Sequence, residues 1–505
     1  MDQNQSPMKE NIPQPIPQPE SPRLLSMRSQ FNFFGIATAI YALFFTFCLY
    51  KNYAGITFPF FVSGTLYYFY LCMKKLSIPL KKDAAFYIVS IVLLGIATFL
   101  TDDGSIIFMN YIAVFTLFIS FLLHHFYEDG KWNFSNSCFV FIASVFGSIT
   151  CIGNPISDFS KYRKEKGKDV KQKNTILYVI LGALAAVPLL FLVLVLLASA
   201  DVVFSDILGK LLDKIFQGDH ILGCIFMFIM AFFLAYAFIA FLCKTDHWDD
   251  PQDKRTGEPV LAITFTTILS IVYIVFSIIQ IVYLFFGQME LPSGYTYAEY
   301  ARQGFFQLLF VCIINLIMVL ICMYRFKESK VLKVILTIIS LCTYIMIASS
   351  ALRMIIYIKF YYLTFLRVFV LWSLAVIFLL MTGVLVTVYK NKFPLFRYSM
   401  IIVTVLYITL SFSHPDYWIA KCNVANLTNY GKSEFFEQRG GYKDMYYLFT
   451  LSMDAAPVLL DMSNYNEEMH KDMLVENYIE KAEEKTENLN LRNFNVSRYI
   501  AKLML

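Results

Sequence analysis

The sequence predicts an all-α, polytopic membrane protein: a transmembrane helical bundle of about eleven spans with a C-terminal extracytoplasmic α-helical module. Of its 505 residues, 58% are hydrophobic and only 16% are charged, whereas an ordinary soluble domain carries about a quarter charged residues. Apolar runs long enough to cross a hydrocarbon core of about 30 Å recur from Phe31 almost to Ser413. The chain after Ser413 is polar, which predicts a separate water-facing module.

Three regions follow one another along the chain. Residues 1–30 contain the proline-rich stretch NIPQPIPQPESP and are expected to form a disordered cytoplasmic tail, with a polyproline ligand as the alternative. Residues 31–413 form the transmembrane domain. Residues 414–505 carry fourteen acidic and ten basic side chains. Helical periodicity at 442–451 and 468–489, with a break at 454–457, predicts a small soluble helical module there.

The transmembrane domain divides into apolar runs separated by short polar loops. The first run follows a polar tail and lacks a small-residue cleavage site, so we expect it to stay as an anchor. The predicted spans are Phe31–Tyr50, Gly55–Met73, Ala84–Thr101, Ser105–His124, Thr175–Ala200, Ile221–Cys243, Pro259–Phe286, Gly304–Met323, Leu332–Ile358, Val368–Tyr389 and Tyr398–Ser413.

Four clusters of Lys and Arg orient these spans, because cytoplasmic loops are enriched in positive residues. With eleven spans and the N-terminus inside, all four clusters lie on the cytoplasmic side, and the chain after Ser413 lies outside. The clusters are Lys74, Lys75, Lys81 and Lys82; Lys161, Arg163, Lys164, Lys166, Lys168, Lys171 and Lys173; Arg325, Lys327, Lys330 and Lys333; and Lys390, Lys392 and Arg397.

Two further segments are apolar without being assigned as spans. Ser135–Gly153 is apolar enough to cross, but a crossing would place the seven-charge cluster outside. An interfacial or re-entrant segment is therefore favoured over a crossing with another span misassigned. Asp201–Phe216 alternates apolar and charged residues with a helical period, which predicts an amphipathic helix lying flat on the outer membrane surface.

No motif of high catalytic or binding specificity occurs in the chain. The phosphate loop, the dinucleotide fingerprint, HExxH and the nucleophile elbow are all missing from the sequence. The ten cysteines are scattered without a CxxC pair, and adjacent His124 and His125 cannot face one metal from the same helical face. The sequence therefore predicts no catalytic residue, no metal and no cofactor. The net charge of +5 resides in loop clusters, which argues against a nucleic-acid partner.

Polar residues near the predicted outer surface form the candidate site. Glu290, Glu299 and Arg302 precede the eighth span, where an outward-facing pocket competes with a purely interfacial role. Arg353 lies near the outer end of the ninth span, and arginine in an apolar helix must reach water or a partner. Its candidate partners are Glu290, Glu299 and Asp201, with snorkelling to the surface as the equal alternative.

Several segments resemble a known family. LLASADVVFSDIL, LPSGYTYAEYARQGFFQLL, YLFTLSMDAAPVLL and NLRNFNVSRYIAKLML are similar to the bacterial membrane-protein family catalogued as domain of unknown function 4173. The resemblance covers most of the chain from the fourth or fifth span onward. It implies a multi-pass protein of the bacterial cytoplasmic membrane, and supplies no activity, substrate or site residue.

Three classes of function remain open. A non-enzymatic envelope protein that binds a partner or senses envelope conditions is favoured, because motifs for chemistry are missing and the water-facing tail is sizeable. A transporter or permease for a neutral or lipid-like solute is the first alternative, and a membrane-embedded enzyme acting on envelope substrates is the second. The expected partners are the lipid bilayer and a protein that binds the C-terminal module.

Overall fold

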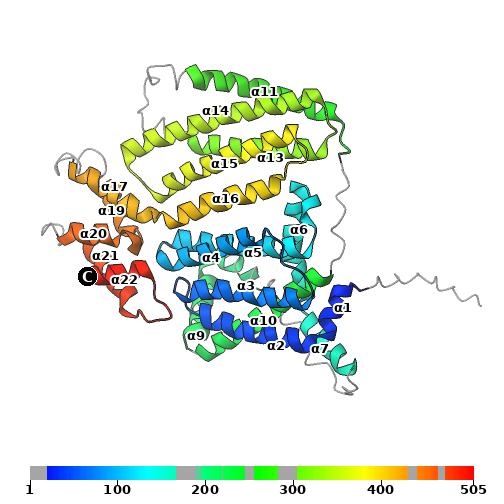
Figure 1. The fold of residues 1–505 in the computed structure, drawn as a ribbon. Helices are drawn as coiled ribbons and strands as arrows, with labels where there is room; N and C mark the ends of the chain where they lie inside the picture. The colour runs from blue at the N-terminus through cyan, green and yellow to red at the C-terminus, as the bar shows by residue number, and fades with distance from the viewer. Residues whose placement is uncertain are drawn as a thin grey trace, which may run out of the picture.

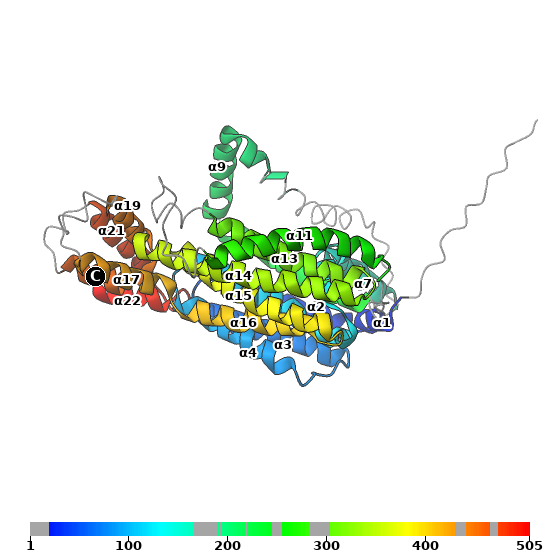
Figure 2. The same cartoon turned by 90° about the horizontal axis from the view of Figure 1, so that it is seen from above.

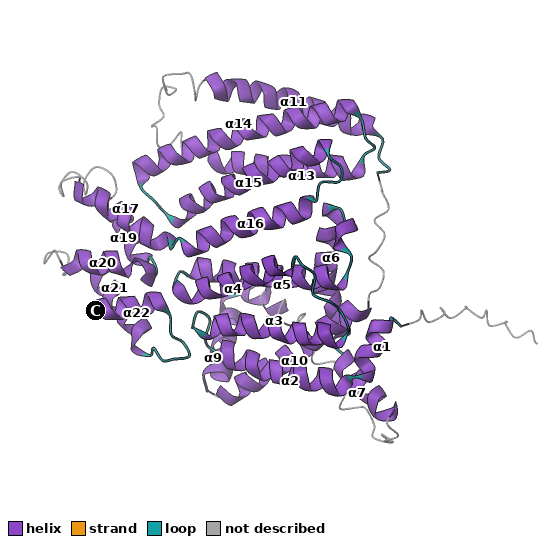
Figure 3. Ribbon diagram, in the orientation of Figure 1, coloured by secondary structure: helices purple, strands orange, loops and turns teal. Residues whose placement is uncertain are grey.

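The computed structural model describes residues 20–165, 190, 193–194, 196–218, 220–244, 255–282, 304–429, 441–464 and 473–505. These residues are almost all helical, and no strand occurs among them, as Figure 3 shows. Nine helices are long and apolar enough to cross a membrane in this part of the chain. The predicted fold class, a polytopic helical bundle, is therefore confirmed.

The ten long helices of the bundle lie roughly side by side (Figure 1). Large apolar side chains are exposed on their outer faces, as expected for surfaces that meet lipid and not water. The helices that form this bundle are α2 (Phe31–Leu49), α3 (Thr57–Lys75), α4 (Ala84–Leu100), α5 (Gly104–Phe126), α10 (His220–Lys244), α11 (Pro259–Gln280), α13 (Phe305–Arg325), α14 (Lys330–Tyr361), α15 (Phe365–Tyr389) and α16 (Leu395–Phe412). All of these except α3 and α4 are among the nine candidate spans.

The bundle has two halves joined by α16. The first half packs α2 to α5 with α10 around one hydrophobic core, and the second packs α11, α13, α14 and α15 around others. Helix α16 contacts α15 on one side and α4 and α5 on the other. Its Tyr407 hydroxyl and Ser411 Oγ both donate to Asn110 Oδ1 of α5, at 2.7 and 2.8 Å. A buried polar contact thus connects the halves.

The basic residues gather at one end of the bundle, called the basic end. Arg397 Nη2 lies 2.7 Å from Asp83 Oδ2 and joins the α15–α16 turn to the α3–α4 turn. Arg255 Nη1 lies 2.6 Å from Glu328 Oε1 and joins the segment before α11 to the α13–α14 turn. Helix α7 (Asn154–Glu165), which carries Lys161 and Arg163 of the second cluster, lies at this end too (Figure 1). The described lysines and arginines of all four clusters therefore share one end, as the predicted threading requires. The opposite end carries the C-terminal helices and is called the module end (Figure 1).

Residues 22–29 differ from the predicted disordered tail. They form α1 (Pro22–Ser29), with proline in the first turn and a Ser21 Oγ that accepts from the Leu24 amide at 3.3 Å. Leu24 and Met27 are buried in the first core. Burial of two apolar side chains against the bundle thus extends order into the tail; residues 1–19 lie outside the described residues.

Helix α6 (Phe134–Gly147) resolves how the unassigned apolar segment runs. Together with the short helix Ser148–Cys151 it is one of the nine candidate spans by length and hydropathy. Its first residue packs on Phe396 with ring centroids 6.1 Å apart, and Gly147 packs against Phe241. Phe396 and Phe241 both lie at the basic end of their helices. The two ends of α6 thus contact the same end of the bundle, an arrangement that favours an interfacial or re-entrant segment over a crossing.

Helix α9 (Val202–Gly218) corresponds to the predicted amphipathic helix. Asp201 precedes it, and its Oδ1 accepts from the Val203 amide at 2.8 Å as an N-terminal cap. Figure 2 shows α9 running across the direction of the spans. It adjoins the start of α10, at the module end. The predicted span Thr175–Ala200 lies mostly outside the described residues.

The C-terminal helices form a compact module. Their shared core includes Leu448, Leu459 and Tyr478. The break predicted at 454–457 is a short helix, η4 (Met453–Ala455), that runs into α20. The helices of the module are α17 (Pro415–Asn429), α19 (Gly441–Thr450), α20 (Ala456–Asn464), α21 (Met473–Glu487) and α22 (Val496–Met504).

Candidate functional site

The predicted polar cluster is only partly within the described residues. Glu290, Glu299 and Arg302 lie outside them, so their pairing with Arg353 stays a prediction. Asp201 is exposed at the start of α9, in the region that packs on α10, whereas Arg353 lies in the second half of the bundle. The structure therefore does not place Asp201 beside Arg353.

Arg353 is buried within the second half of the bundle. Only 8% of the residue is exposed. Its Nη2 donates to Gln280 Oε1 of α11 at 3.1 Å, and Ser349 Oγ donates to the same oxygen at 2.6 Å. Gly304, at φ +105°, lies so close that an added Cβ would be 2.9 Å from Arg353 Nη1. Gln280 is a partner that the sequence analysis missed, although a glutamine at the end of an apolar run was a signal for it.

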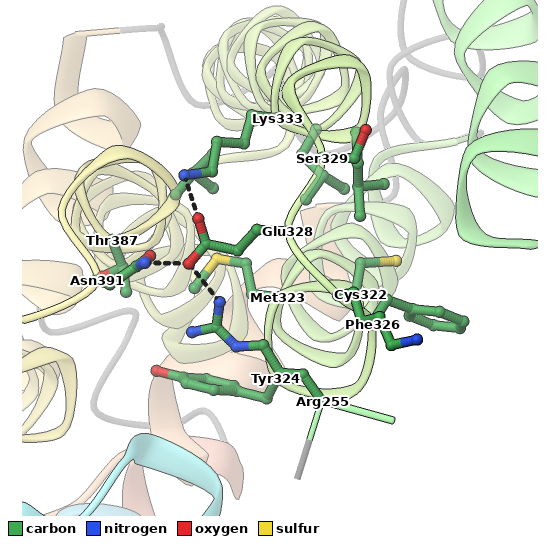
Figure 4. A pocket seen from close by; sticks show the side chains of 14 residues that line it. Arg255, Cys322, Met323, Tyr324, Phe326, Glu328, Ser329, Lys333, Thr387 and Asn391 are labelled. Atoms are coloured by element: carbon green, nitrogen blue, oxygen red, sulfur yellow. Dashed lines mark hydrogen bonds and ion pairs between the residues drawn. The ribbon is translucent and has the colours of Figure 1, made fainter. Parts of the chain in front are cut away.

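Glu328 organises the basic end (Figure 4). Its carboxylate accepts from Arg255 at 2.6 Å and from Lys333 at 2.9 Å, and also from Asn391. Hydrogen bonds from Lys333 and Arg255 lower the pKa of Glu328 to about 2. The adjoining cavity has a volume of about 40 Å³, which holds little more than water. These contacts connect the segment before α11, the α13–α14 turn and the α15–α16 turn. The cavity beside them is too small for a sizeable ligand.

Several buried charges of the described residues gather where the module meets the spans, and we call this region the module junction. Asp102, in the α4–α5 turn, has a side chain only 1% exposed, and receives Lys485 Nζ and Arg498 Nε at 2.6 Å each. Because an unpaired buried charge is costly, these two ion pairs hold α21 and α22 on the spans. Arg498 lies 396 residues after Asp102, so no local sequence pattern reveals the pair.

Asp454 of η4 is the second buried carboxylate of the junction. Its side chain is fully buried and accepts from Thr101 Oγ1 at 2.6 Å, the Asp102 amide at 2.7 Å and His414 Nδ1 at 3.0 Å. Burial alone would raise the pKa of Asp454, but the hydrogen bond from His414 and those from the α4–α5 turn lower it. The carboxylate is thus kept ionised and fixed against the spans.

Asp103 and Asp416 titrate differently from Asp454. Burial, and then the charge of Asp416, raise the pKa of Asp103 to about 7. Burial also raises the pKa of Asp416, whose Oδ2 accepts from the Ser452 amide at 2.9 Å. Oδ2 of Asp103 is buried without a hydrogen-bond partner among the described residues. Asp103 therefore gains or loses a proton near neutral pH.

Beside Asp454 lies a cavity of about 440 Å³, which we call the His414 pocket. His414 follows α16 directly, and its left-handed backbone, at φ 47°, turns the chain from α16 into α17. The hydrogen bond from His414 raises its own pKa, because the imidazolium is stabilised by Asp454. The pocket is lined by Leu100, Phe412, Ser413, His414, Tyr417, Trp418, Met453, Asp454, Pro457, Val496, Ser497 and Ile500.

Further hydrogen bonds connect the module to both halves of the bundle. Asn495 Nδ2 donates to the carbonyl oxygens of Ala54 and Thr101, at 3.0 and 2.8 Å. In the second half, the amide of Leu363 donates to Asn423 Oδ1 at 3.0 Å, and Asn423 Nδ2 donates back to the Leu363 carbonyl at 2.9 Å. The module therefore bridges the module ends of α4, α5, α14 and α15.

Fold and junction together define a class: a multi-pass integral membrane protein whose spans carry a docked C-terminal helical module. The chain belongs to the family described as domain of unknown function (DUF4153), whose model matches residues 88–462. The resemblance to domain of unknown function 4173 is thus corrected to another family of unknown function. The match begins within α4, earlier than expected, and ends before the final segment NLRNFNVSRYIAKLML. No curated protein and no solved structure matches the chain.

Proposed function

We propose that this chain is a non-enzymatic protein of the bacterial cytoplasmic membrane whose C-terminal module senses conditions outside the cell membrane. The basic end faces the cytoplasm in this proposal, because cytoplasmic loops are enriched in Lys and Arg. The module end then faces outward. One observation carries the proposal: ionisable side chains from separate segments pack between the module and the spans. These are Asp102, Asp103, His414, Asp416, Asp454, Lys481, Lys485 and Arg498.

The charges of the junction make docking sensitive to pH. The pKa values of Asp103, Asp416 and His414 are all raised in the docked state, so docking takes up protons. The stabilisation of the docked state by Asp103 is complete below the ordinary pKa of an aspartate, about 4, and is lost as the pH rises to about 7. The pKa of Asp454 is lowered, so Asp454 weakens docking as the pH falls, but only below about pH 4. Docking should therefore weaken as the pH rises from mildly acidic to neutral.

Hydrogen exchange of the full-length protein in lipid nanodiscs tests this proposal. Protection of α21 and α22 amides, corrected for the intrinsic rate, should fall as the pH rises from about 5 to about 8. In Asp103→Asn, which cannot ionise at this position, the fall should be smaller. Asp206→Asn in the exposed part of α9 is the matched control and should respond like the wild type.

Two results would contradict the proposal. Protection of α21 and α22 that is constant across the pH range in the wild type would show that the module does not respond. Protein-dependent flux of a neutral or lipid-like solute into proteoliposomes would support the transporter instead.

A further inference from the structure

We propose that the His414 pocket binds the anionic head of an amphipathic, lipid-like molecule, a phosphate or a carboxylate, with the apolar part of the ligand against Leu100 and Phe412. This site goes beyond the sensing role. It does not depend on a pH response, because ligand binding and module docking are measured separately.

The position of the pocket supplies the apolar part of the argument. Leu100 and Phe412 are the last residues of α4 and α16, so the pocket begins where these apolar helices of the bundle end. Met453 and Val496 of the module add further apolar surface, and Ile500 stands at the exposed edge. A molecule with its chain on the membrane side would therefore meet apolar walls.

His414 supplies the polar anchor. Its Nδ1 is held by Asp454 at 3.0 Å, which fixes the orientation of the ring. No described residue hydrogen-bonds its Nε2, and this atom is not among the buried atoms that lack a partner. Nε2 is therefore accessible, and in the imidazolium form it is a charged donor for an oxyanion.

The neighbouring polar groups leave this donor available. The carboxylate of Asp454 is already engaged by three donors. Ser413 and Ser497 donate to the carbonyl oxygens of Leu410 and Leu100, both at 2.7 Å. Among the histidine and the serines of the wall, the accessible donor is therefore His414. The Tyr417 hydroxyl and the Trp418 indole N–H line the same pocket as further, uncharged donors.

A second positive charge lies close to the pocket. Lys421 Nζ is 5.2 Å from the ring centroid of Trp418, which lines the pocket and is half exposed. Trp418 and Tyr417 are aromatic side chains of the kind enriched at membrane interfaces. The volume of about 440 Å³ is within the usual range for a small-molecule site and accommodates a headgroup with the start of a chain.

Titration calorimetry of the full-length protein in a neutral maltoside detergent tests the site. The probes are dihexanoyl phosphatidylglycerol, dihexanoyl phosphatidylcholine and glycerol 3-phosphate, at neutral pH. We expect the anionic lipid to bind about tenfold or more tightly than the zwitterionic lipid and than glycerol 3-phosphate. Equal affinity for the two lipids would overturn the anionic preference, and equal affinity for glycerol 3-phosphate would overturn the amphipathic ligand in favour of a soluble anion.

Variants separate the pocket from the fold. His414→Gln should lower affinity for the anionic lipid about tenfold or more. Because His414 also belongs to the junction, Ile500→Glu is the second test: Ile500 is 39% exposed and lies at the edge of the pocket. It places a negative charge there without removing a junction contact, and Ile500→Gln is its uncharged control. Anionic-lipid affinities that are equal in Ile500→Glu, Ile500→Gln and the wild type would place the ligand elsewhere and overturn the proposal.

Discussion

Single carboxylates decide where the C-terminal helices sit. Asp102 is almost fully buried yet receives Lys485 and Arg498 together with the Met453 amide. A buried carboxylate with several donors is fixed in position, whereas an exposed ion pair contributes little to stability. The same chemical type, an aspartate, therefore has very different consequences at Asp102 and at Asp206, whose pair with Lys210 is exposed.

We predict that Asp102→Ala loosens the module. Removal of a fully buried partner costs roughly 3 to 5 kcal/mol. Here the cost should be about 2 to 3 kcal/mol, because the side chains of Lys485 and Arg498 are 33% and 27% exposed and keep some hydration. The measurement is the free energy of local opening of α21 and α22 by hydrogen exchange. Asp206→Ala is the control, and an equal effect of both substitutions would contradict the role given to Asp102.

A second residue-scale prediction concerns Arg353. Gln280→Leu removes an acceptor of the buried guanidinium, and should lower the stability of the detergent-solubilised protein by about 1 to 3 kcal/mol. Gln307→Leu, on the exposed face of α13, is the matched control and should have little effect. The thermal unfolding midpoint is the readout.

A double-mutant cycle tests the predicted acidic partner of Arg353. It combines Arg353→Ala with Glu299→Gln and is repeated at Glu290. Strictly additive effects on stability would contradict a pair between Arg353 and either glutamate.

At the scale of elements, hydrophobicity predicts that a helix forms but not always where it runs. The runs that became α2, α5 and α10 to α16 were recognised because each is long and apolar. Helix α6 has a similar composition, yet both of its ends contact the basic end. Hydropathy measures how favourable it is to transfer a segment out of water. It does not tell whether the segment crosses the bilayer or lies along its surface. The charge cluster after it was the sequence signal that favoured an interfacial or re-entrant segment.

The contacts of the module junction could not be predicted from the sequence. Asp102 and Asp103 are adjacent in the turn between two predicted spans, but nothing nearby in the sequence indicates that Asp102 contacts α22. Likewise, the break at 454–457 was recognised as a helix boundary, although its aspartate is an acceptor for three separate donors. Long-range pairs of this kind depend on tertiary packing, so a site built from them was not predicted.

Helix α9 supports a prediction at this scale. Phe204 and Leu208 lie half-buried on its apolar face, while Asp206 and Lys210 form an exposed ion pair 2.6 Å apart on the opposite face. In a bilayer the apolar face should enter the interface. Spin labels at Phe204 and Leu208 should therefore be accessible to oxygen, which partitions into lipid, and labels at Asp206 and Lys210 to a water-soluble nickel reagent. The same accessibility at all four positions would contradict an interfacial helix.

For the whole molecule, the two ends of the bundle predict its orientation. The basic end should be cytoplasmic and the module end external. Cys422 of α17 is partly exposed, in contrast to buried Cys48. An impermeant maleimide should therefore label Cys422 in intact cells of a variant that lacks the other cysteines. A C-terminal fusion reporter that is active only in the cytoplasm would contradict this orientation.

The distance along the chain between Asp102 and Arg498 also has a consequence for biosynthesis. At about 5 to 20 residues per second, the 396 residues between them take roughly 20 to 80 s to synthesise. During that time α4 and α5 are already made, but Asp102 has neither of its cationic partners, so its carboxylate must remain hydrated. The helices on either side of Asp102 are therefore made well before its partners, and the nine-residue helix α22 supplies Arg498 later than α21 supplies Lys485. Without α22, the described spans would all be present, but Asp102 would lack the contact of Arg498.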